Sequence, residues 1–397
     1  MTSISSLRAI VLDLPPSCIE FYPLAPQYAV IGTYNLEKQE GQQEREGQEV
    51  AQAEGQKTSQ QRNGSLILAE VIGDDVVLRQ TLPTPSAILD VHFNGKSEAG
   101  IFGVATSTGS IGIYKLAIAA KESPAIVHMH TLQFFPEDAL ITAFSWHPDG
   151  KILGMTLSTG EVDLGEYAES KTDAASARTF KITAHDLEAW TLAFIPDGSG
   201  VLSGGDDAAL RFAELPRRPL DDLEDSDVAP EHAPWRKMPW ADKKVHGAGV
   251  TAILPVYWDE DSVLTITGSY DDNIRLVEAP TVGRRQVLAE MNLSGGVWRL
   301  KVLSRKPVLD DDADQASWGC GSRPEEFLLL VSCMHAGTRI MKLACVDEVW
   351  QFEVLAKFEE HKSMNYGSDN QPKLNAQGQR TFLSTSFYDR LLCLWRY

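Results

Sequence analysis

The chain has 397 residues, of which 43% are hydrophobic, and its formal net charge is −19. Such a length and hydrophobic content are typical of a folded globular protein with a large core, and the acidic balance argues against a nucleic-acid partner and favours a basic protein surface. The five cysteines are scattered and form no CxxC pair, which favours reduced thiols in the cytosol or nucleus and argues against a zinc or other metal site.

The N-terminal segment "MTSISSLRAIVLDL" is not expected to be a signal peptide, because its apolar run is short and is broken by Arg8 and Asp13. No stretch of the chain approaches the roughly 20 apolar residues of a membrane span. We therefore expect a cytoplasmic protein without a membrane partner.

Short strand-like runs with a central tight turn recur along the whole chain. In order they are "AVIGTYNL", "IFGVATSTGSIGIYKL", "ILGMTLSTGEVDLGEY", "VLSGGDDAALRFAEL", "VLTITGSYDDNIRLVEA", "LLLVSCMHAGTRIMKL" and "TFLSTSFYDRLLCLWRY". Each predicts strand, turn, strand, and self-similarity at about 50 residues is typical of propeller blades. The prediction is an all-β fold, a seven-bladed WD-repeat β-propeller formed by residues 1–397 as one monomeric domain, rather than a row of unrelated β-sandwiches.

Two further features refine this prediction. The last run ends at Tyr397 without a fourth strand, so we expect Arg8–Asp13 to supply that strand and close the ring. Histidines precede three of the units, at His185, His246 and His361. A histidine before the first strand and an aspartate in the second turn form the hydrogen-bonding device of WD repeats, and we expect this pairing between His185 and Asp207.

Three insertions interrupt the period, at residues 37–63, 216–244 and 305–326. The first consists almost entirely of Gln, Glu and Gly, so we expect it to be disordered. The second contains Trp235 and Trp240, and is either a surface loop with both tryptophans packed on the blade or a segment that docks a partner. The third is expected to be a surface loop.

Aligning the turns by their strands places polar residues in one column around one face of the ring. The column contains Asn35, Thr108, Thr159, Asp207, Asp271, His335 and Asp389, and the residues just before them are Tyr34, Ser107, Ser158, Asp206, Tyr270, Met334 and Tyr388. Blades 5, 6, 7 and 1 are contiguous in a closed ring, so we expect their Tyr, Asp and His residues to share one sector. His335 stands where the fold does not require an imidazole, and can exchange a proton near neutral pH.

The motifs "GTYNL", "EAW", "GGDD", "TGSYDDNIRL", "GGVWRLK", "SCMHAGTRI", "HKSMNYGSD" and "SFYDRLLCLWR" together resemble those of the WD-repeat diphthine methylesterases, also called diphthine methyltransferases. The resemblance is good in blades 1 and 4 to 7 and loose in blades 2 and 3, and the long Gln/Glu insertion departs from it. It implies hydrolysis of the methyl ester of methylated diphthine on translation elongation factor 2, with no cofactor. The competing hypothesis is a scaffold that binds the elongation factor and recruits other enzymes without catalysis.

Such a substrate carries a trimethylammonium group, which favours aromatic faces at about 0.5–2 kcal/mol per contact. We expect a substrate-binding cage built from Tyr34, Tyr270, Tyr388, Trp298 and Trp190. Ester hydrolysis also needs a base and a donor to the oxyanion. We assign the base to His335, oriented by Asp271 or Asp389, and the donor to Arg299 or a tyrosine hydroxyl. A covalent route through Ser269, Ser386 or Cys333 is the lesser alternative.

Overall fold

The computed structural model describes residues 2–36, 62–118, 123–167, 177–215, 239–259, 262–280, 283–306 and 323–397. Within these ranges the regular structure consists of β-strands. The described part of the chain contains no helix long and apolar enough to cross a membrane.

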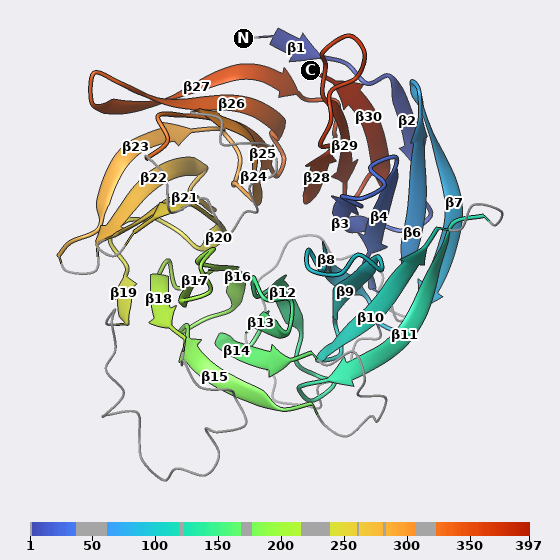
Figure 1. Cartoon of the computed structure of the whole chain (residues 1–397), viewed down its shortest axis with the longest axis horizontal. Helices are drawn as coiled ribbons and strands as arrows, with labels where there is room; N and C mark the ends of the chain where they lie inside the picture. The colour runs from blue at the N-terminus through green and yellow to red at the C-terminus, as the bar shows by residue number, and fades with distance from the viewer. Residues whose placement is uncertain are drawn as a thin grey trace, which may run out of the picture.

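Seven sheets of four or five strands surround a central channel, and their strands are antiparallel except for the edge strand β1 Thr2–Ile4. This confirms the predicted seven-bladed propeller (Figure 1). Blade 1 consists of β3 Pro16–Phe21, β4 Tyr28–Thr33, β5 Asn35–Leu36, β6 Arg62–Ile72 and β7 Asp75–Thr84. Blade 2 consists of β8 Ile88–Phe93, β9 Ile101–Thr106, β10 Ser110–Ala117 and β11 Ala125–Gln133. Blade 3 consists of β12 Ile141–Trp146, β13 Ile152–Leu157, β14 Glu161–Glu166 and β15 Thr179–Ala184. Blade 4 consists of β16 Ala189–Phe194, β17 Gly200–Gly205, β18 Leu210–Glu214 and β19 Trp240–Asp242. Blade 5 consists of β20 Val250–Trp258, β21 Ser262–Ser269, β22 Asn273–Pro280 and β23 Gln286–Asn292. Blade 6 consists of β24 Arg299–Lys306, β25 Glu326–Cys333, β26 Gly337–Val346, β27 Val349–Phe358 and β1 Thr2–Ile4. Blade 7 consists of β28 Gly367–Asn370, β29 Thr381–Ser386, β30 Leu391–Arg396 and β2 Arg8–Val11.

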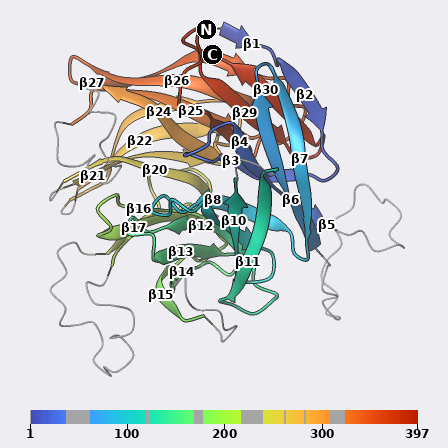
Figure 2. The ribbon, with the colours of Figure 1, turned by 45° about the vertical axis from the view of Figure 1, so that its right-hand side comes forward.

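The N-terminal segment closes the ring, as predicted. Strand β2 pairs antiparallel with β30 and becomes the outer strand of blade 7. Strand β1 was not predicted; it pairs in parallel with β27 at the outer edge of blade 6. The N-terminal strands therefore join two neighbouring blades, and Figures 1 and 2 both show the N- and C-termini close together there.

The core lies between adjacent blades, where apolar side chains of facing sheets pack together. Between blades 6 and 7, the rings of Phe358 and Phe382 stack on the fully buried Trp395, with ring centroids 5.2 and 4.2 Å away. The indole N–H of Trp395 donates to Ser384, whose hydroxyl also contacts His361 at 2.8 Å. Trp395 thus anchors blade 7 against blade 6.

The predicted histidine–aspartate pair is confirmed in blade 4, where His185 Nδ1 lies 2.8 Å from Asp207 Oδ1. Blades 5 and 7 use their turn acids differently. Asp271 accepts the backbone N–H of Gly247, and Asp389 accepts that of Lys362, so each acid contacts the residue after the blade's histidine instead of the imidazole. The turn acid still joins two loops in all three blades.

The predicted insertions fall largely outside the described residues, which end or resume at 36 and 62, 215 and 239, and 306 and 323. Trp235 lies outside them too. Two strands begin at or next to these edges: Arg62 begins β6, and Trp240 begins β19. Trp240 stacks on Phe212 of the same blade, and the guanidinium of Arg285 lies 3.9 Å from its ring centroid.

In blades 2 to 7 each residue of the predicted column lies in a turn between two strands, but blade 1 differs. There Asn35 lies in the short strand β5, which pairs with β6, and its side-chain amide donates to Asn63 at 2.9 Å. The prediction of a tight turn at Asn35 is therefore wrong, because the first insertion separates β5 from β6. Tyr34 still follows directly on β4.

Candidate functional site

Aromatic side chains gather at one edge of blades 4 to 7 and 1. Strands alternate in direction, so the ends of the second strands and the starts of the first strands lie at the same edge of the propeller. Tyr270 follows β21 and Tyr34 follows β4, whereas Trp298 immediately precedes β24 and Tyr366 immediately precedes β28. Rings separated by hundreds of residues in the sequence are brought together in this way.

The rings form one continuous series of contacts around Trp298. Its ring centroid lies 4.9 Å from that of Tyr366, 5.8 Å from Trp190 and 6.1 Å from Tyr270. Phe387 extends the series, at 5.4 Å from Tyr366, 6.3 Å from Tyr34 and 5.1 Å from Tyr388. We call these residues the aromatic cluster: Tyr34, Trp190, Tyr270, Trp298, Tyr366, Phe387 and Tyr388. All five predicted cage residues lie in it.

The cluster is accessible from solvent. Tyr388 is 70% exposed and Tyr270 36% exposed, while the other members are half-buried. Trp298 also lines the central channel. The aromatic cluster therefore borders the opening of that channel.

One carboxylate belongs to this site. The indole N–H of Trp190 donates to Asp206 Oδ1 at 2.7 Å. Burial raises the pKa of Asp206, while the hydrogen bond from Trp190 opposes this shift. Burial, followed by the charges of Asp206 and Tyr366, raises the pKa of Tyr270, so its hydroxyl stays protonated and can donate a hydrogen bond at neutral pH.

A glycine permits this close arrangement. A Cβ atom on Gly249 would lie 2.6 Å from Asp206 Oδ1 and 3.0 Å from Tyr270 Cδ2. Any larger residue at 249 would push the carboxylate and the ring apart. Three members of the site were not predicted, namely Asp206, Tyr366 and Phe387. Asp206 nevertheless occupies the same position before the turn as Tyr270 does, which is a usable signal in the sequence.

His335 is an exposed turn residue between β25 and β26. Its neighbour Met334 packs closely against Gly296, in the loop that carries Trp298. A Cβ atom added to Gly296 would lie only 2.7 Å from the Met334 sulfur. Met334 also forms a backbone bridge with Asn365, which precedes Tyr366. His335 thus borders the aromatic cluster, and its imidazole has no hydrogen bond or ion pair with the residues that the structure describes.

The two acids predicted to orient His335 have other partners. Asp271 binds both terminal nitrogens of Arg275, at 3.0 and 2.7 Å, and accepts two backbone N–H groups. Burial opposes its ionisation, yet these bonds lower the pKa of Asp271 to about 2. Asp389 accepts hydrogen bonds from the hydroxyls of Ser363 and Ser386. Neither carboxylate contacts His335, because local turn contacts occupy both.

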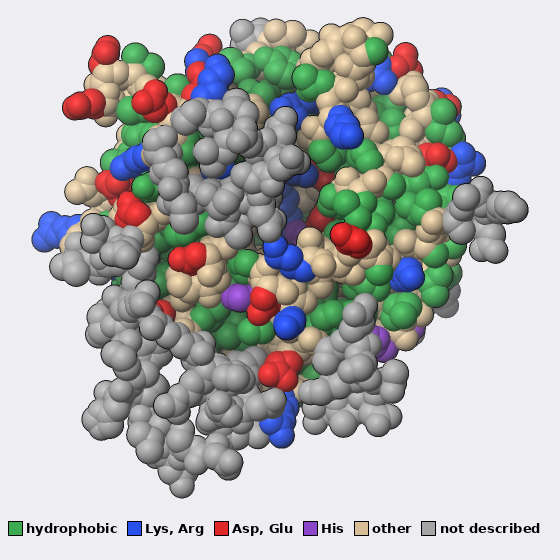
Figure 3. All heavy atoms as spheres, viewed as in Figure 1, with side chains coloured by type: hydrophobic (Ala, Val, Ile, Leu, Met, Phe, Trp, Pro, Cys, Tyr) green, Lys and Arg blue, Asp and Glu red, His purple; other side chains and the backbone are tan. Residues whose placement is uncertain are grey.

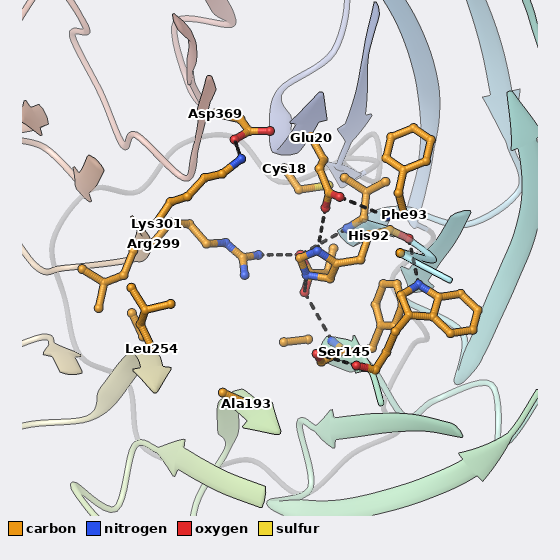
Figure 4. A pocket seen from close by; sticks show the side chains of 18 of the residues that line it. Cys18, Glu20, His92, Phe93, Ser145, Ala193, Leu254, Arg299, Lys301 and Asp369 are labelled. Atoms are coloured by element: carbon orange, nitrogen blue, oxygen red, sulfur yellow. Dashed lines mark hydrogen bonds and ion pairs between the residues drawn. The ribbon is translucent and has the colours of Figure 1, made fainter. Parts of the chain in front are cut away.

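Arg299 points into the central channel, away from the turn column. Its guanidinium donates to Asp90 Oδ1 of β8 at 2.7 Å (Figure 4). The structure therefore does not bring Arg299 to Asp271 or Asp389, although Arg299 follows Trp298 in the chain.

The three alternative nucleophiles are buried. Ser269 and Ser386 are fully buried, and their hydroxyls donate to the Ala248 carbonyl and to Asp389 respectively. Cys333 is fully buried as well, and burial raises the pKa of its thiol to about 12. These side chains stabilise the blades and present no reactive atom to a substrate.

The propeller fold is accompanied by a direct match to a repeat family. Residues 176–212 match the family model described as WD domain, G-beta repeat. The chain is also similar in fold to a chain in the solved structure named "Crystal Structure of Mitotic Checkpoint Complex", with a TM-score of 0.59 at 13% sequence identity, over 100% of this chain and 93% of that one. The molecule is a WD-repeat β-propeller.

Curated relatives narrow this class further. The chain is 26% identical over 442 aligned positions to the Saccharomyces cerevisiae protein named diphthine methyltransferase, covering 98% of this chain and 97% of that protein. It is 26% identical to the Dictyostelium discoideum diphthine methyltransferase homolog, covering 97% of each. It is 27% identical to the Homo sapiens diphthine methyltransferase, covering 92% of this chain and 74% of that protein. The predicted resemblance to the diphthine methyltransferase family is confirmed along nearly the whole chain.

Proposed function

We propose that this protein hydrolyses the methyl ester of methylated diphthine on translation elongation factor 2, and releases methanol and diphthine. The similarity to proteins named diphthine methyltransferase supports the choice of substrate. The freed carboxylate is then available for the amidation that completes diphthamide. Since the substrate is a translation factor, we expect the protein to act in the cytoplasm.

The observation that carries the proposal is the aromatic cluster with Asp206 at its edge. A quaternary ammonium binds to faces of Trp and Tyr rings, and each contact contributes about 0.5–2 kcal/mol. A nearby carboxylate adds charge complementarity, and Asp206 supplies it within the cluster, held by Trp190. A site for an ordinary apolar side chain has no need of a partly buried acid.

The chemistry requires little beyond this site. In the substrate the trimethylammonium and the ester are attached to the same carbon, so binding the cation brings the ester to the cluster. A base removes a proton from water, the resulting hydroxide attacks the carbonyl carbon, and the bond to the methoxy oxygen breaks as methanol leaves with a proton. Water and side chains are sufficient for these steps.

Two groups are suited to the role of base. His335 is exposed and unpaired among the described residues, and it borders the cluster. Asp206 lies within the cluster, and burial raises its pKa above the ordinary value of an aspartate. We assign the base to His335 and the counter-ion of the ammonium to Asp206. For the oxyanion donor we choose the Tyr270 hydroxyl over Arg299, because the guanidinium of Arg299 is bound to Asp90.

Mass spectrometry of the modified elongation factor tests this proposal. Incubation with the purified protein, without a methyl donor, is expected to remove the mass of one methylene from the methylated residue and to release methanol. A scaffold would bind the factor and leave its mass unchanged. A gain of mass that depends on a methyl donor would instead establish methyl transfer, the reaction that the relatives' name describes.

A further inference from the structure

The central channel holds a cavity that the proposed reaction does not use. Its volume is about 680 Å³, within the usual range of small-molecule sites. The innermost strand of every blade contributes to its wall, from β3 in blade 1 to β28 in blade 7. Figure 3 shows the molecule hollowed near the centre of one face, with charged side chains inside the hollow.

The wall of this cavity has two different halves (Figure 4). Strands β3, β8, β24 and β28 contribute the charged residues Glu20, Asp90, His92, Arg299, Lys301 and Asp369. Strands β12, β16 and β20 contribute small or apolar side chains, among them Ala193 and Leu254. A ligand that fits both halves has a charged end and an apolar end.

The charged half presents its cations to the cavity and buries its acids behind them. Arg299 pairs with Asp90, and their side chains are 30% and 2% exposed. Lys301 pairs with Asp369, and their side chains are 45% and 4% exposed. In both pairs the base is therefore the partner that a ligand meets.

Backbone groups satisfy the buried acids from the opposite side. Asp90 accepts N–H groups from Val91 and Phe144, at 3.1 and 3.3 Å, and Asp369 accepts that of Phe21 at 2.7 Å. Among the residues that the structure describes, Arg299 donates one hydrogen bond of the five that a guanidinium can make, so most of its donors stay available. Lys301 similarly has three ammonium hydrogens, and its one partner in the described structure is Asp369.

A third cation adjoins this pair. His92 Nδ1 lies 2.7 Å from Glu20 and its Nε2 lies 3.2 Å from Asp90. Burial favours the neutral ring, but the two carboxylates outweigh it and raise the pKa of His92 to about 10. The strands of this half-wall contribute three cations and three carboxylates, and Lys96 of the loop after β8 also lines the cavity. The lining therefore has an excess of one positive charge, which matches a singly charged anion better than a doubly charged one.

We propose that the channel is a binding site for a small amphiphilic carboxylate, whose carboxylate binds Arg299 and Lys301 and whose apolar part packs against Ala193 and Leu254. A guanidinium matches a carboxylate in two parallel hydrogen bonds, and such bonds are strong in a channel partly shielded from water. The site borders the aromatic cluster at Trp298, but the residues that bind the ligand are different and so is the sign of the charge that they bind.

Calorimetric titration of the full chain with hexanoate and with hexanamide tests this site. The two probes have the same apolar tail, and they differ in that one bears a carboxylate and the other a neutral amide. We expect hexanoate to bind at least about tenfold more tightly. Equal affinity for both probes would overturn the proposal, because it would mean that the cations make no contribution.

Three variants locate the binding. Lys301→Gln removes a cation but leaves Asp369 bonded to the Phe21 amide, and Leu254→Glu places an acid on the apolar wall; each is expected to weaken hexanoate binding about tenfold or more. Lys357→Gln removes a partly exposed lysine of β27, outside the channel, and is expected to bind hexanoate like the unmodified protein. Unchanged binding by a folded Lys301→Gln, or equal loss in Lys357→Gln, counts against the channel. None of these measurements involves ester hydrolysis. A negative result for carboxylate binding therefore leaves the proposed hydrolysis untouched, and a negative result for hydrolysis leaves the binding site untouched.

Discussion

Asp206 and Asp207 are consecutive residues whose carboxylates face different partners. Asp207 binds the buried His185 at 2.8 Å, whereas Asp206 accepts the indole N–H of Trp190 at 2.7 Å. One acid ties two loops of blade 4 together, and its neighbour joins the accessible aromatic cluster. Substitution of Asp207 is therefore expected to change stability, and substitution of Asp206 to change substrate binding, although the two residues lie in the same turn.

Asp206→Asn removes the charge of the site while leaving an oxygen that can accept the Trp190 hydrogen bond. We expect KM for methylated diphthine on the elongation factor to rise about tenfold, as for loss of one charged contact to the ammonium, and the melting temperature to change little. Steady-state kinetics check this. A fall in kcat of about 10²-fold or more with KM unchanged would instead make Asp206 the base.

Asp207→Ala leaves His185 and the backbone N–H of Asp186 without their acceptor. We expect the free energy of unfolding to fall by about 1–3 kcal/mol, because a buried donor is left unpaired. Turnover per folded molecule should be retained. Urea denaturation gives the first quantity, and a stability equal to that of the unmodified protein would contradict the structural role of Asp207.

His335→Ala tests the assignment of the base. The side chain is exposed and supports no described hydrogen bond, so we expect the variant to fold normally and bind the elongation factor. Loss of a general base typically lowers turnover about 10²–10⁴-fold. Near-normal turnover in this variant would sink the assignment, and Asp206 would then be the group to examine.

Tyr270→Phe separates the ring from its hydroxyl. The ring contact with Trp298 is kept, so we expect KM to be unchanged. Loss of an oxyanion donor costs about 10²–10³-fold in kcat in enzymes where it has been removed. Tyr270→Ala, which also removes the ring, should raise KM in addition. If Tyr270→Phe retains full kcat, the donor is another group.

Two buried histidines predict how stability depends on pH. Burial lowers the pKa of His246 and of His361 to about 4, from an ordinary value of 6.5. Between these values the unfolded chain binds protons that the folded chain does not. The stability that these two histidines contribute is therefore complete above pH 6.5 and falls as the pH drops towards 4, on the order of 1–2 kcal/mol per histidine between pH 7 and pH 5. Urea midpoints at both pH values measure this, and His246→Gln should flatten the dependence; an equally steep fall in that variant would rule His246 out as a source.

The fold was predictable because its signals are local. Each hairpin shows two apolar halves around a Gly or Asp turn, and the pairing of His185 with Asp207 follows from their positions in one repeat. Closure by β2 followed from counting strands in the last repeat. Strand β1 could not be predicted, since three residues at the edge of blade 6 contain no distinctive pattern.

For the candidate site, the sequence was sufficient to predict most of the aromatic residues but not the contacts between side chains. Position before the turn column predicted that Tyr34, Tyr270 and Tyr388 lie at one edge, and position at the start of a first strand placed Trp190 and Trp298 at the same edge. The direction of each side chain, however, depends on neighbouring blades. Asp271 was given the wrong neighbour because Arg275, four residues later, binds it within the same hairpin. The channel pair Arg299 and Asp90 joins positions 209 residues apart, and no local pattern relates them.

The N-terminal strands affect the order in which the molecule can be completed during synthesis. Asp13, just after β2, accepts a hydrogen bond from Arg390, 377 positions later in the chain. Strand β2 therefore leaves the ribosome early and waits for β30, while the last blade lacks its outer strand until the two meet. During that interval both partners expose unpaired backbone edges. The pairing that closes the ring therefore forms only once β30 has been synthesised, and the nascent chain is most open to mispairing at the two strands that close it.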